Sequence, residues 1–381
     1  MRVLHVVDSA EPRGGEIFAS DLIRAIDRPD VSHRVAILRD LGGVTISYGA
    51  PTVVLPASGR TVPGFRMDPA TIRGLRSIVR RWTPDIVQSH GGDTLKHAVA
   101  ATTGYRIRLV YRAIGAAPSW ATRGPRRVVY GRLIRSATRV VAVAEAVRHE
   151  IVARFGASEA HVVTIANGVD PERLSSERSR ASVRRSLGIP SGSPVILSLG
   201  SLNWEKDPLA HLQVVSRVCQ RVPAVRHLMV GDGPLRDEVS STVGRMGLAG
   251  RVLVLGARRD IADLLRASDV VLLASRIEGM PACLIEGGMA GLPAVAYAIA
   301  GIPEIVDDGS TGVLVRPGDV GGLADSVSRL LADPETRKAM GRRARLRCRA
   351  HFDVRVIATK YLELWQEILT STDSSRAGAA R

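Results

Sequence analysis

The sequence of 381 residues is poor in aromatic residues and cysteines, and each shortage excludes a class of protein. Aromatic residues make up 4% of the chain, whereas proteins that bind single-stranded nucleic acid stack bases on aromatic side chains. We find no nucleic-acid-binding module, so we expect no nucleic-acid partner. Cys219, Cys283 and Cys348 are far apart and form no Cys-x-x-Cys pair, which argues against a disulfide framework and against a cysteine-based metal site.

Long apolar runs are also missing. No run approaches the ~20 residues that a helix needs to cross a bilayer. The first residues, Met1–Asp8, contain too short an apolar stretch for a signal peptide and reach an acidic residue at once. From these two features we expect a cytoplasmic protein.

Lysine is scarce although the net charge is +16, because 49 of the 53 basic residues are arginine and four are lysine. The arginines are scattered, as coding bias in a GC-rich genome would leave them, and a basic surface favours anionic partners. The stretch Arg123–Arg139 carries six arginines among apolar residues. It fits a helix resting on the inner face of an anionic membrane, and it fits a solvated helix face. Both interpretations stay open.

Short apolar runs alternate with helical patterns along the chain, which predicts parallel sheets with crossover helices. Their β-branched, near-continuous hydrophobic character is typical of strands buried on both faces. The predicted strands of the first half are Val3–Val7, Val35–Leu38, Thr52–Leu55, Asp85–Ser89, Leu109–Tyr111, Val140–Val143 and Val162–Ala166. Those of the second half are Pro194–Leu199, His227–Val230, Val252–Leu255, Val270–Leu273, Ala294–Tyr297 and Gly312–Val315.

Two such series of similar length predict two doubly wound α/β domains, at residues 1–172 and 190–352. The segment Pro171–Pro194 is rich in Ser, Arg, Pro and Gly, so we expect it to be the connection between domains and the hinge for their closure, with a short helix near Ala181–Leu187. A helix is predicted at Val354–Leu369, within residues 353–370. The tail, residues 371–381, is small and polar, and we expect it to be disordered.

The strongest functional signal is the segment Ser275–Glu286, which follows a predicted strand and so lies at the carboxyl edge of a parallel sheet. Pro281 fits the first residue of a helix, and Gly279 lets the backbone approach a ligand closely. The N–H groups of the first helical turn would favour a phosphate. Glu286, an acceptor-only carboxylate, could accept hydrogen bonds from both hydroxyls of a ribose.

Glu278 and Glu286, with seven residues between them, frame Gly279-Met280-Pro281, and this arrangement resembles the donor motif of the retaining glycosyltransferases of family 4. The alternative is a pair of solvated glutamates, because the bare spacing arises by chance in any charged helix.

The resemblance covers nearly the whole chain and is dense from Val195 to Asp319. It extends through residues 291–293, 301–306, 308–315 and 317–319. It implies a glycosyltransferase-B fold, with two Rossmann-like domains facing across a cleft, the donor mostly on the C-terminal domain and the acceptor mostly on the N-terminal one. It also implies that the final helix crosses back to the N-terminal domain.

A second motif, Val195–Pro208, runs from a strand through a glycine turn to Lys206, near the start of the next helix. A lysine there could neutralise charge on a departing diphosphate, although a surface lysine is the alternative. The family usually has an arginine where this chain has Ser201, so half of the expected phosphate clamp is absent. Arg258 is our candidate to replace it.

Two loops of the first half complete the candidate site. Gly14 and Gly15 lie between the first strand and a helix, where glycines can present N–H groups to an anion or make a tight turn. His90 ends a predicted strand in a glycine-rich loop, and a histidine satisfied within the loop is the alternative. The resemblance implies that both loops serve the site. The family often has a second histidine where this chain has Arg112 or Ile114, which leaves the acceptor-side chemistry open.

The resemblance implies a hexosyltransferase that retains the anomeric configuration without a protein nucleophile, by orientation and by stabilisation of the leaving phosphate. We expect no metal or other cofactor, because no Asp, His or Cys cluster has metal-ligand spacing. The expected partners are a UDP- or GDP-sugar donor and a carbohydrate, lipid-linked or small-molecule acceptor. The expected catalytic residues are Lys206, Glu278 and His90. The expected donor-binding residues are Gly14, Gly15, Ser201, Lys206, Gly279, Met280, Pro281, Ala282, Cys283, Leu284 and Glu286.

Three alternatives stay open. One is a phosphorylase of the same fold, which normally binds pyridoxal on a lysine and is disfavoured by the few lysines. Another is a nucleotide-sugar epimerase of related fold. The third is a noncatalytic binding protein that keeps the fold with a decayed site. Ser201 and Ile114 support the third alternative, whereas the intact Glu278, Lys206 and Glu286 argue against it.

Overall fold

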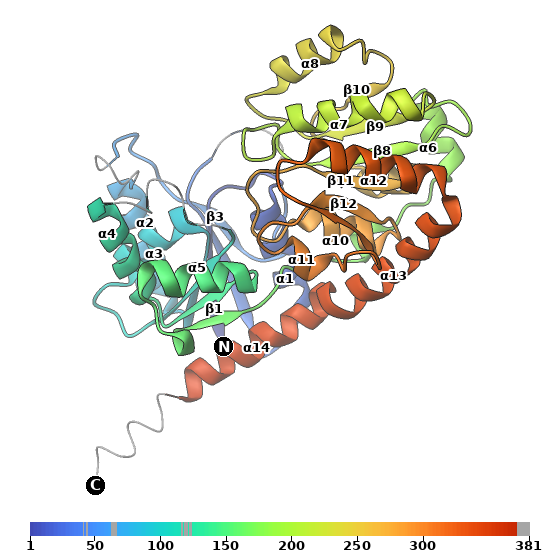
Figure 1. Ribbon diagram of the computed structural model, residues 1–381. Coiled ribbons are helices and arrows are strands. Elements are labelled where there is room, and N and C mark those ends of the chain that lie inside the picture. Colours follow the sequence, from blue (N-terminus) through green and yellow to red (C-terminus); the bar gives the residue numbers. More distant parts are fainter. Residues whose placement is uncertain are drawn as a thin grey trace. The chain divides into compact units, whose positions relative to one another are not determined.

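The computed structural model describes residues 1–40, 42, 45–61, 67–115, 117, 121 and 124–371. The chain divides into two compact units, one formed by Met1–Gly168 together with the segment from Val354 onward, the other by Val169–Asp353. Each unit contains one sheet of parallel strands with helices packed on it (Figure 1). The predicted α/β class with two Rossmann-like units is confirmed.

The first sheet has the strand order β3-β2-β1-β4-β5-β6-β7. All seven strands predicted for this half are present, with shifts at their ends. Their bounds are β1 Arg2–Val7, β2 Ser32–Ile37, β3 Thr52–Val54, β4 Ile86–His90, β5 Arg108–Ala113, β6 Arg139–Ala142 and β7 Val162–Thr164. Because the chain reverses its direction of winding between β1 and β4, crossover helices cover both faces of this sheet.

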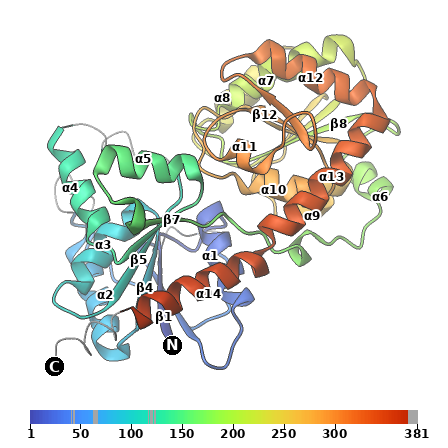
Figure 2. The same cartoon turned by 60° about the horizontal axis from the view of Figure 1, so that its bottom comes forward.

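Helices α1 and α14 pack against each other on one face of the first sheet, as Figure 2 shows. The apolar cluster beneath them joins Phe18 and Leu22 of α1 to Tyr361 and Trp365 of α14 and to Val3 of β1. The final helix of the chain therefore completes the core of the first unit. The helices of this unit are α1 Gly14–Ala25, α2 Pro69–Trp82, α3 Gly92–Thr102, α4 Gly124–Arg135, α5 Glu145–Phe155, the 3-10 helix η2 Glu159–His161 and α14 Val354–Thr370.

Helix α4 carries part of the arginine-rich stretch. Arg126, Arg127 and Arg132 are exposed on it, and so is the apolar Val128, at 52%, whereas Tyr130 is buried. Both interpretations of this stretch stay open, and its first residue, number 123, lies outside the described residues, as does the tail from residue 372 onward. Within the described part of the chain, no helix combines the length and apolar character that crossing a membrane requires.

The second sheet has the order β10-β9-β8-β11-β12-β13, again with every predicted strand present. Helices α7 and α12 pack together on one side of it and α10 and α13 on the other (Figure 1). The strands are β8 Val195–Leu199, β9 Arg226–Val230, β10 Val252–Val254, β11 Val270–Leu273, β12 Ala294–Tyr297 and β13 Gly312–Val315. The helices are η3 Glu172–Leu174, α6 Arg180–Ser186, α7 Pro208–Arg221, α8 Arg236–Arg245, α9 Ile261–Ala267, α10 Ala282–Met289, α11 Ile302–Ile305, α12 Val320–Ala332 and α13 Pro334–Phe352.

The segment Pro171–Pro194 lies within the second unit and is not a free connection between the two units. Its role as the hinge for domain closure stays a prediction. Its helix α6, found where a short helix was predicted, packs with η3 on α9 inside the second unit. The chain passes between units at Gly168–Val169 and again at Asp353–Val354. The two passages lie side by side, since Val169 N donates to Phe352 O at 2.9 Å.

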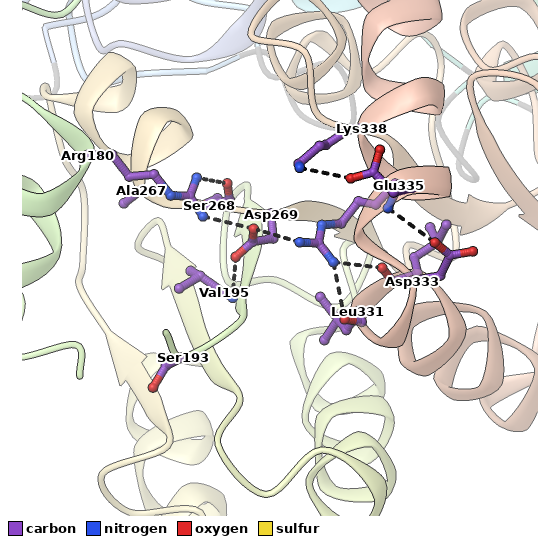
Figure 3. Close-up of polar contacts among 12 residues, drawn as sticks. Arg180, Ser193, Val195, Ala267, Ser268, Asp269, Leu331, Asp333, Glu335 and Lys338 are labelled. Carbon is purple, nitrogen blue, oxygen red and sulfur yellow. Dashed lines mark hydrogen bonds and ion pairs between the residues drawn. The ribbon is translucent and has the colours of Figure 1, made fainter. Parts of the chain in front are cut away.

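Asp269, just before β11, fastens this segment to the second unit (Figure 3). Its carboxylate accepts hydrogen bonds at 2.8 Å from both Arg180 Nη2 and Arg184 Nη2 of α6, and at 2.9 Å from Val195 N of β8. Arg337 of α13 adds a longer ion pair at 3.5 Å. The Asp269 side chain is only 11% exposed. One largely desolvated carboxylate therefore forms ion pairs with three guanidinium groups.

Asp269→Ala should therefore destabilise the second unit by about 3 kcal/mol, because it leaves the largely buried guanidinium groups of Arg184 and Arg337 without their carboxylate. Urea unfolding measures the change. The matched control is Asp325→Ala, which removes a half-exposed carboxylate paired with Arg221 and should leave the unfolding midpoint almost unchanged. Equal effects of the two substitutions would contradict the structural role of Asp269.

Candidate functional site

At the carboxyl edge of the second sheet, the loops after β8 and β11 are joined by polar contacts. Lys206 Nζ donates to both carboxylate oxygens of Glu278, each at 2.7 Å. Glu205 O accepts from Arg276 N at 2.8 Å, and Arg276 Nε donates to Asp207 Oδ2 at 2.5 Å. Since β8 and β11 are parallel neighbours, their carboxyl ends meet at one edge. Lys206 and Glu278, predicted separately, thus form one ion pair.

The turn before α7 holds Lys206 in place. Asn203 Oδ1 accepts from Lys206 N at 3.0 Å, and Asp207 caps α7 by accepting from Ala210 N at 3.1 Å. The Glu278 side chain is 3% exposed and that of Lys206 28%. A carboxylate buried to this degree is costly without a cation, so the pair holds the ammonium group at a fixed position.

Helix α10 begins at Ala282, one residue later than predicted, with Pro281 as its N-cap, a difference within the usual variation of helix ends. Ala282 and Cys283 supply first-turn N–H groups, which helix geometry leaves without intrahelical acceptors. The side chains of Met280 and Leu284 are buried in the core. Of the predicted donor-binding residues, these two can therefore serve a ligand only through their backbone.

Cys283 is disfavoured as a nucleophile at neutral pH. Burial raises the pKa of its thiol to about 12, and the nearby carboxylate of Glu278 adds to this effect. The reactive form of cysteine is the thiolate, which is therefore scarce at this site.

Glu286 lies on α10 with a side chain that is 11% exposed, and its Oε1 accepts from Arg173 Nη2 at 3.0 Å. Arg173 belongs to η3, in the segment that was predicted to connect the two domains. No pattern marked it, because it is one arginine among 49 and lies 113 residues from its partner. Its guanidinium orients the carboxylate, and an ionised carboxylate can accept hydrogen bonds from hydroxyls.

Ser201, where the family's arginine is missing, is exposed beside Gly200. With Lys206 it lines a small cavity of about 20 Å³ at the ends of β8 and β9. Arg258, the candidate to replace that arginine, pairs with Asp260: its Nε and Nη2 donate to the two carboxylate oxygens of Asp260 at 2.8 and 2.6 Å. Within the described residues, no contact joins Arg258 to the Lys206–Glu278 pair.

Gly14 and Gly15 are the first two residues of α1, as predicted. A Cβ built on Gly14 would meet no atom within 4 Å in the described structure, and one on Gly15 would meet only the Ile114 side chain, at 3.8 Å. Packing within the described part of the chain therefore does not require glycine at either position. This supports the prediction that the loop leaves room for a ligand, which stays a prediction.

Glu16, the next residue, was not singled out from the sequence. Burial raises the pKa of its carboxyl group to about 7, and the charge of Asp8 adds to the shift. A carboxyl group with a pKa near neutrality, next to Gly14 and Gly15, is a candidate for proton transfer.

His90 is the last residue of β4 and is buried. Its Nε2 lies 3.2 Å from His5 Nδ1, and its register partner on β5 is Arg112. Burial, with the charge of Arg112, lowers the pKa of His90 well below its usual value, so the imidazole is neutral at neutral pH. Of the two places where a second histidine was considered, Arg112 is inside the core and Ile114 is 44% exposed.

The predicted residues thus fall into two groups. Lys206, Glu278 and Glu286 share the carboxyl edge of the second sheet, whereas Gly14–Gly15 and His90 belong to the first unit. Within the described residues, no group of three or more His, Cys, Asp or Glu side chains is arranged to hold a metal ion.

Two family models match this chain. "Glycosyltransferase Family 4" matches residues 12–173, and "Glycosyl transferases group 1" matches residues 179–347. The chain is 28% identical to N-acetyl-alpha-D-glucosaminyl L-malate synthase of Bacillus anthracis, over 79% of this chain and 80% of that one. It is 29% identical to D-inositol 3-phosphate glycosyltransferase of Saccharomonospora viridis, over 67% and 62%. Its fold is similar to the crystal structure of Anabaena HepE with UDP and glucose, with a TM-score of 0.82, 22% identity and coverage of 96% and 99%.

If Glu286 binds a nucleotide ribose, Arg173→Met should weaken nucleotide binding by roughly ten- to a hundredfold, because Glu286 loses the cation that orients it. Calorimetric titration with UDP measures the affinity. The control is Arg178→Met, which removes an arginine of the same segment that pairs with Asp263. Equal UDP affinity in the two variants would show that Arg173 does not act through Glu286.

Proposed function

Because this chain belongs to the glycosyltransferases of family 4, we propose that it transfers a hexosyl group from a UDP-sugar to a hydroxyl of its acceptor, with retention of anomeric configuration. The observation that carries the proposal is the Lys206–Glu278 ion pair beside the N-terminus of α10, in the segment that resembles the family's donor motif. The same edge carries Glu286 with its arginine partner.

In the proposed mechanism, Lys206 and the first N–H groups of α10 bind the diphosphate and stabilise the charge that grows on it as the sugar leaves. Glu286 accepts hydrogen bonds from the ribose. Glu278 contacts the region of the donor sugar and positions Lys206. The chemistry needs no protein nucleophile, and the protonated thiol of Cys283 is consistent with that. Gly14, Gly15 and His90 are assigned to the phosphate and acceptor side.

UDP is the preferred donor nucleotide in this proposal, since HepE was crystallised with UDP and glucose. The acceptor is a small hydroxyl compound, because one relative is named for L-malate and another for inositol 3-phosphate. Release of UDP from UDP-glucose and UDP-N-acetylglucosamine, with each of these acceptors, identifies the substrates. Epimerisation of the donor without transfer would favour the epimerase, and binding without turnover the noncatalytic protein.

Donor binding should need no divalent metal. UDP at 100 times its Kd should stabilise the protein by about 2.7 kcal/mol, with or without EDTA, and GDP and ADP should stabilise it less at the same concentration. A thermal-shift titration measures both effects. Loss of the UDP shift in EDTA, restored by Mg²⁺ or Mn²⁺, would contradict metal-independent binding.

Substitutions at Glu286 and Lys206 should affect different steps. Glu286→Ala removes hydrogen bonds to the ribose in ground and transition state alike, so it should weaken UDP binding by roughly ten- to a hundredfold. Lys206 faces charge that develops during the reaction, so Lys206→Met should lower kcat by a factor on the order of 10²–10³, and this fall should exceed the rise in the donor KM. Steady-state kinetics with varied donor separates the two.

Lys206→Met also leaves the buried Glu278 carboxylate without its cation, so this variant should lose stability. The double variant Lys206→Met/Glu278→Gln removes the uncompensated charge and tests whether the loss of kcat persists in a stable protein. If both single variants keep wild-type kcat and UDP affinity, the donor site lies elsewhere.

A further inference from the structure

Three histidines from three neighbouring strands form a chain of ring contacts in the first sheet. His5 Nε2 lies 3.0 Å from His33 Nδ1, and His5 Nδ1 lies 3.2 Å from His90 Nε2. At the outer end, His33 Nε2 lies 3.4 Å from the carbonyl oxygen of Ile26. At the inner end, His90 Nδ1 is buried and has no hydrogen-bond partner within the described residues.

The contacts determine which nitrogen carries the proton in each ring. A carbonyl oxygen can only accept, so His33 Nε2 carries a proton and its Nδ1 is an acceptor in the neutral ring. His5 Nε2 must then donate to His33, which leaves His5 Nδ1 as an acceptor. His90 Nε2 must in turn donate to His5. In this arrangement His90 Nδ1 is an unprotonated acceptor.

All three rings are held in their neutral form. Burial lowers the pKa of His5, His33 and His90, and the charge of Arg112 adds to the effect at His90. The ionisable groups that act on Arg112 are Tyr361 of α14 and, from α1, Glu16. A proton taken up by His90 would place a second buried cation near Arg112.

Helix α14 restrains the chain of rings. The Trp365 ring contacts His5 edge-on with centroids 6.0 Å apart, and Trp365 Nε1 donates to Gln88 Oε1 at 3.2 Å. The rings of His5 and His90 are stacked with centroids 5.5 Å apart. Packing thus fixes the ring positions, and the hydrogen bonds fix the protons.

We propose that His5 and His33 are positioning residues that hold His90 as its Nε2–H tautomer, so that His90 Nδ1 accepts a hydrogen bond from a hydroxyl of the acceptor substrate. The inference rests on the proposed function, in which His90 serves the acceptor side. His90 orients the hydroxyl and does not remove its proton, because the imidazolium that would result is disfavoured beside Arg112. The substrate group recognised here is therefore a neutral hydrogen-bond donor.

The experiment is nitrogen-15 NMR of the full chain labelled at its nine histidines, with His90 assigned by the signals lost in His90→Gln. Wild-type His90 should show a pyrrole-type Nε2 and a pyridine-type Nδ1, unchanged between about pH 5 and 8. An Nδ1–H tautomer, or a protonated ring in that range, would overturn the proposal.

A matched pair of substitutions tests the positioning role. His33→Gln keeps an oxygen to accept from His5 and an amide N–H for Ile26 O, so it should preserve the tautomer of His90 and kcat. His33→Leu and His5→Phe remove these groups, so His90 should show mixed tautomers and kcat should fall roughly ten- to a hundredfold with little change in the donor KM. His227→Phe, which replaces a buried histidine of the second unit, is the control for lost stability and should leave the His90 signals unchanged.

Wild-type tautomer and kcat in His33→Leu would overturn the positioning role, and wild-type kcat in His90→Gln would overturn the contact with the acceptor. Both results concern only the first unit. The binding of UDP by the wild-type protein tests the proposed donor site of the second unit and is independent of them. Absence of UDP binding in the wild-type protein would instead reject the proposed donor function.

Discussion

The parallel alignment of all strands in both sheets is the constraint on which the candidate site depends. It brings the carboxyl ends of neighbouring strands to one edge, whatever the distance between them in sequence. In the second unit this edge joins the loops after β8 and β11, and with them Lys206 and Glu278, which are 72 residues apart. In the first unit it places Gly91, after β4, within reach of Ile114, after β5, since a Cβ on Gly91 would lie 3.4 Å from that side chain. Both groups of candidate residues follow from the order in which strands pair.

Charges at the donor edge are compensated by the protein itself. Glu278 neutralises Lys206, and Arg173 neutralises Glu286, in positions that are largely shielded from water. In the proposed mechanism, an incoming diphosphate would compete with Glu278 for the lysine, which would cost part of the attraction but keep the ammonium group in position for the reaction. Such preorganisation matters most where charge develops in the transition state. Under that proposal the arrangement favours catalysis over tight ground-state binding. The Arg173–Glu286 pair also links this edge of the second sheet to η3, a few residues beyond the passage between units.

The first unit shows a different use of buried polar groups. His5, Gln88, His90 and Arg112 lie on the sheet face covered by α1 and α14, where apolar side chains would be expected. Several of them contact one another or α14, so their desolvation is partly offset by hydrogen bonds. Because α14 follows the whole second unit in the sequence, the first unit completes this layer only after the second unit has been synthesised. The arrangement of His90 thus depends on residues from both ends of the sequence.

Some parts of the fold and of the candidate site could be predicted from the sequence alone, and others could not. All thirteen strands could be predicted, because strands buried on both faces leave continuous β-branched runs that are a local property of the chain. The donor motif Ser275–Glu286 and Lys206 could be recognised because their residue types and spacing are themselves local.

The connection at Pro171–Pro194 could not be interpreted correctly, since its composition resembles a linker while its arginines bind Asp269 about 85 residues away. The Lys206–Glu278 and Arg173–Glu286 pairs and the histidine chain were likewise decided only by tertiary structure. Each of these contacts joins residues far apart in sequence. The local sequence around a residue does not show which of the many arginines or histidines the fold will place beside it.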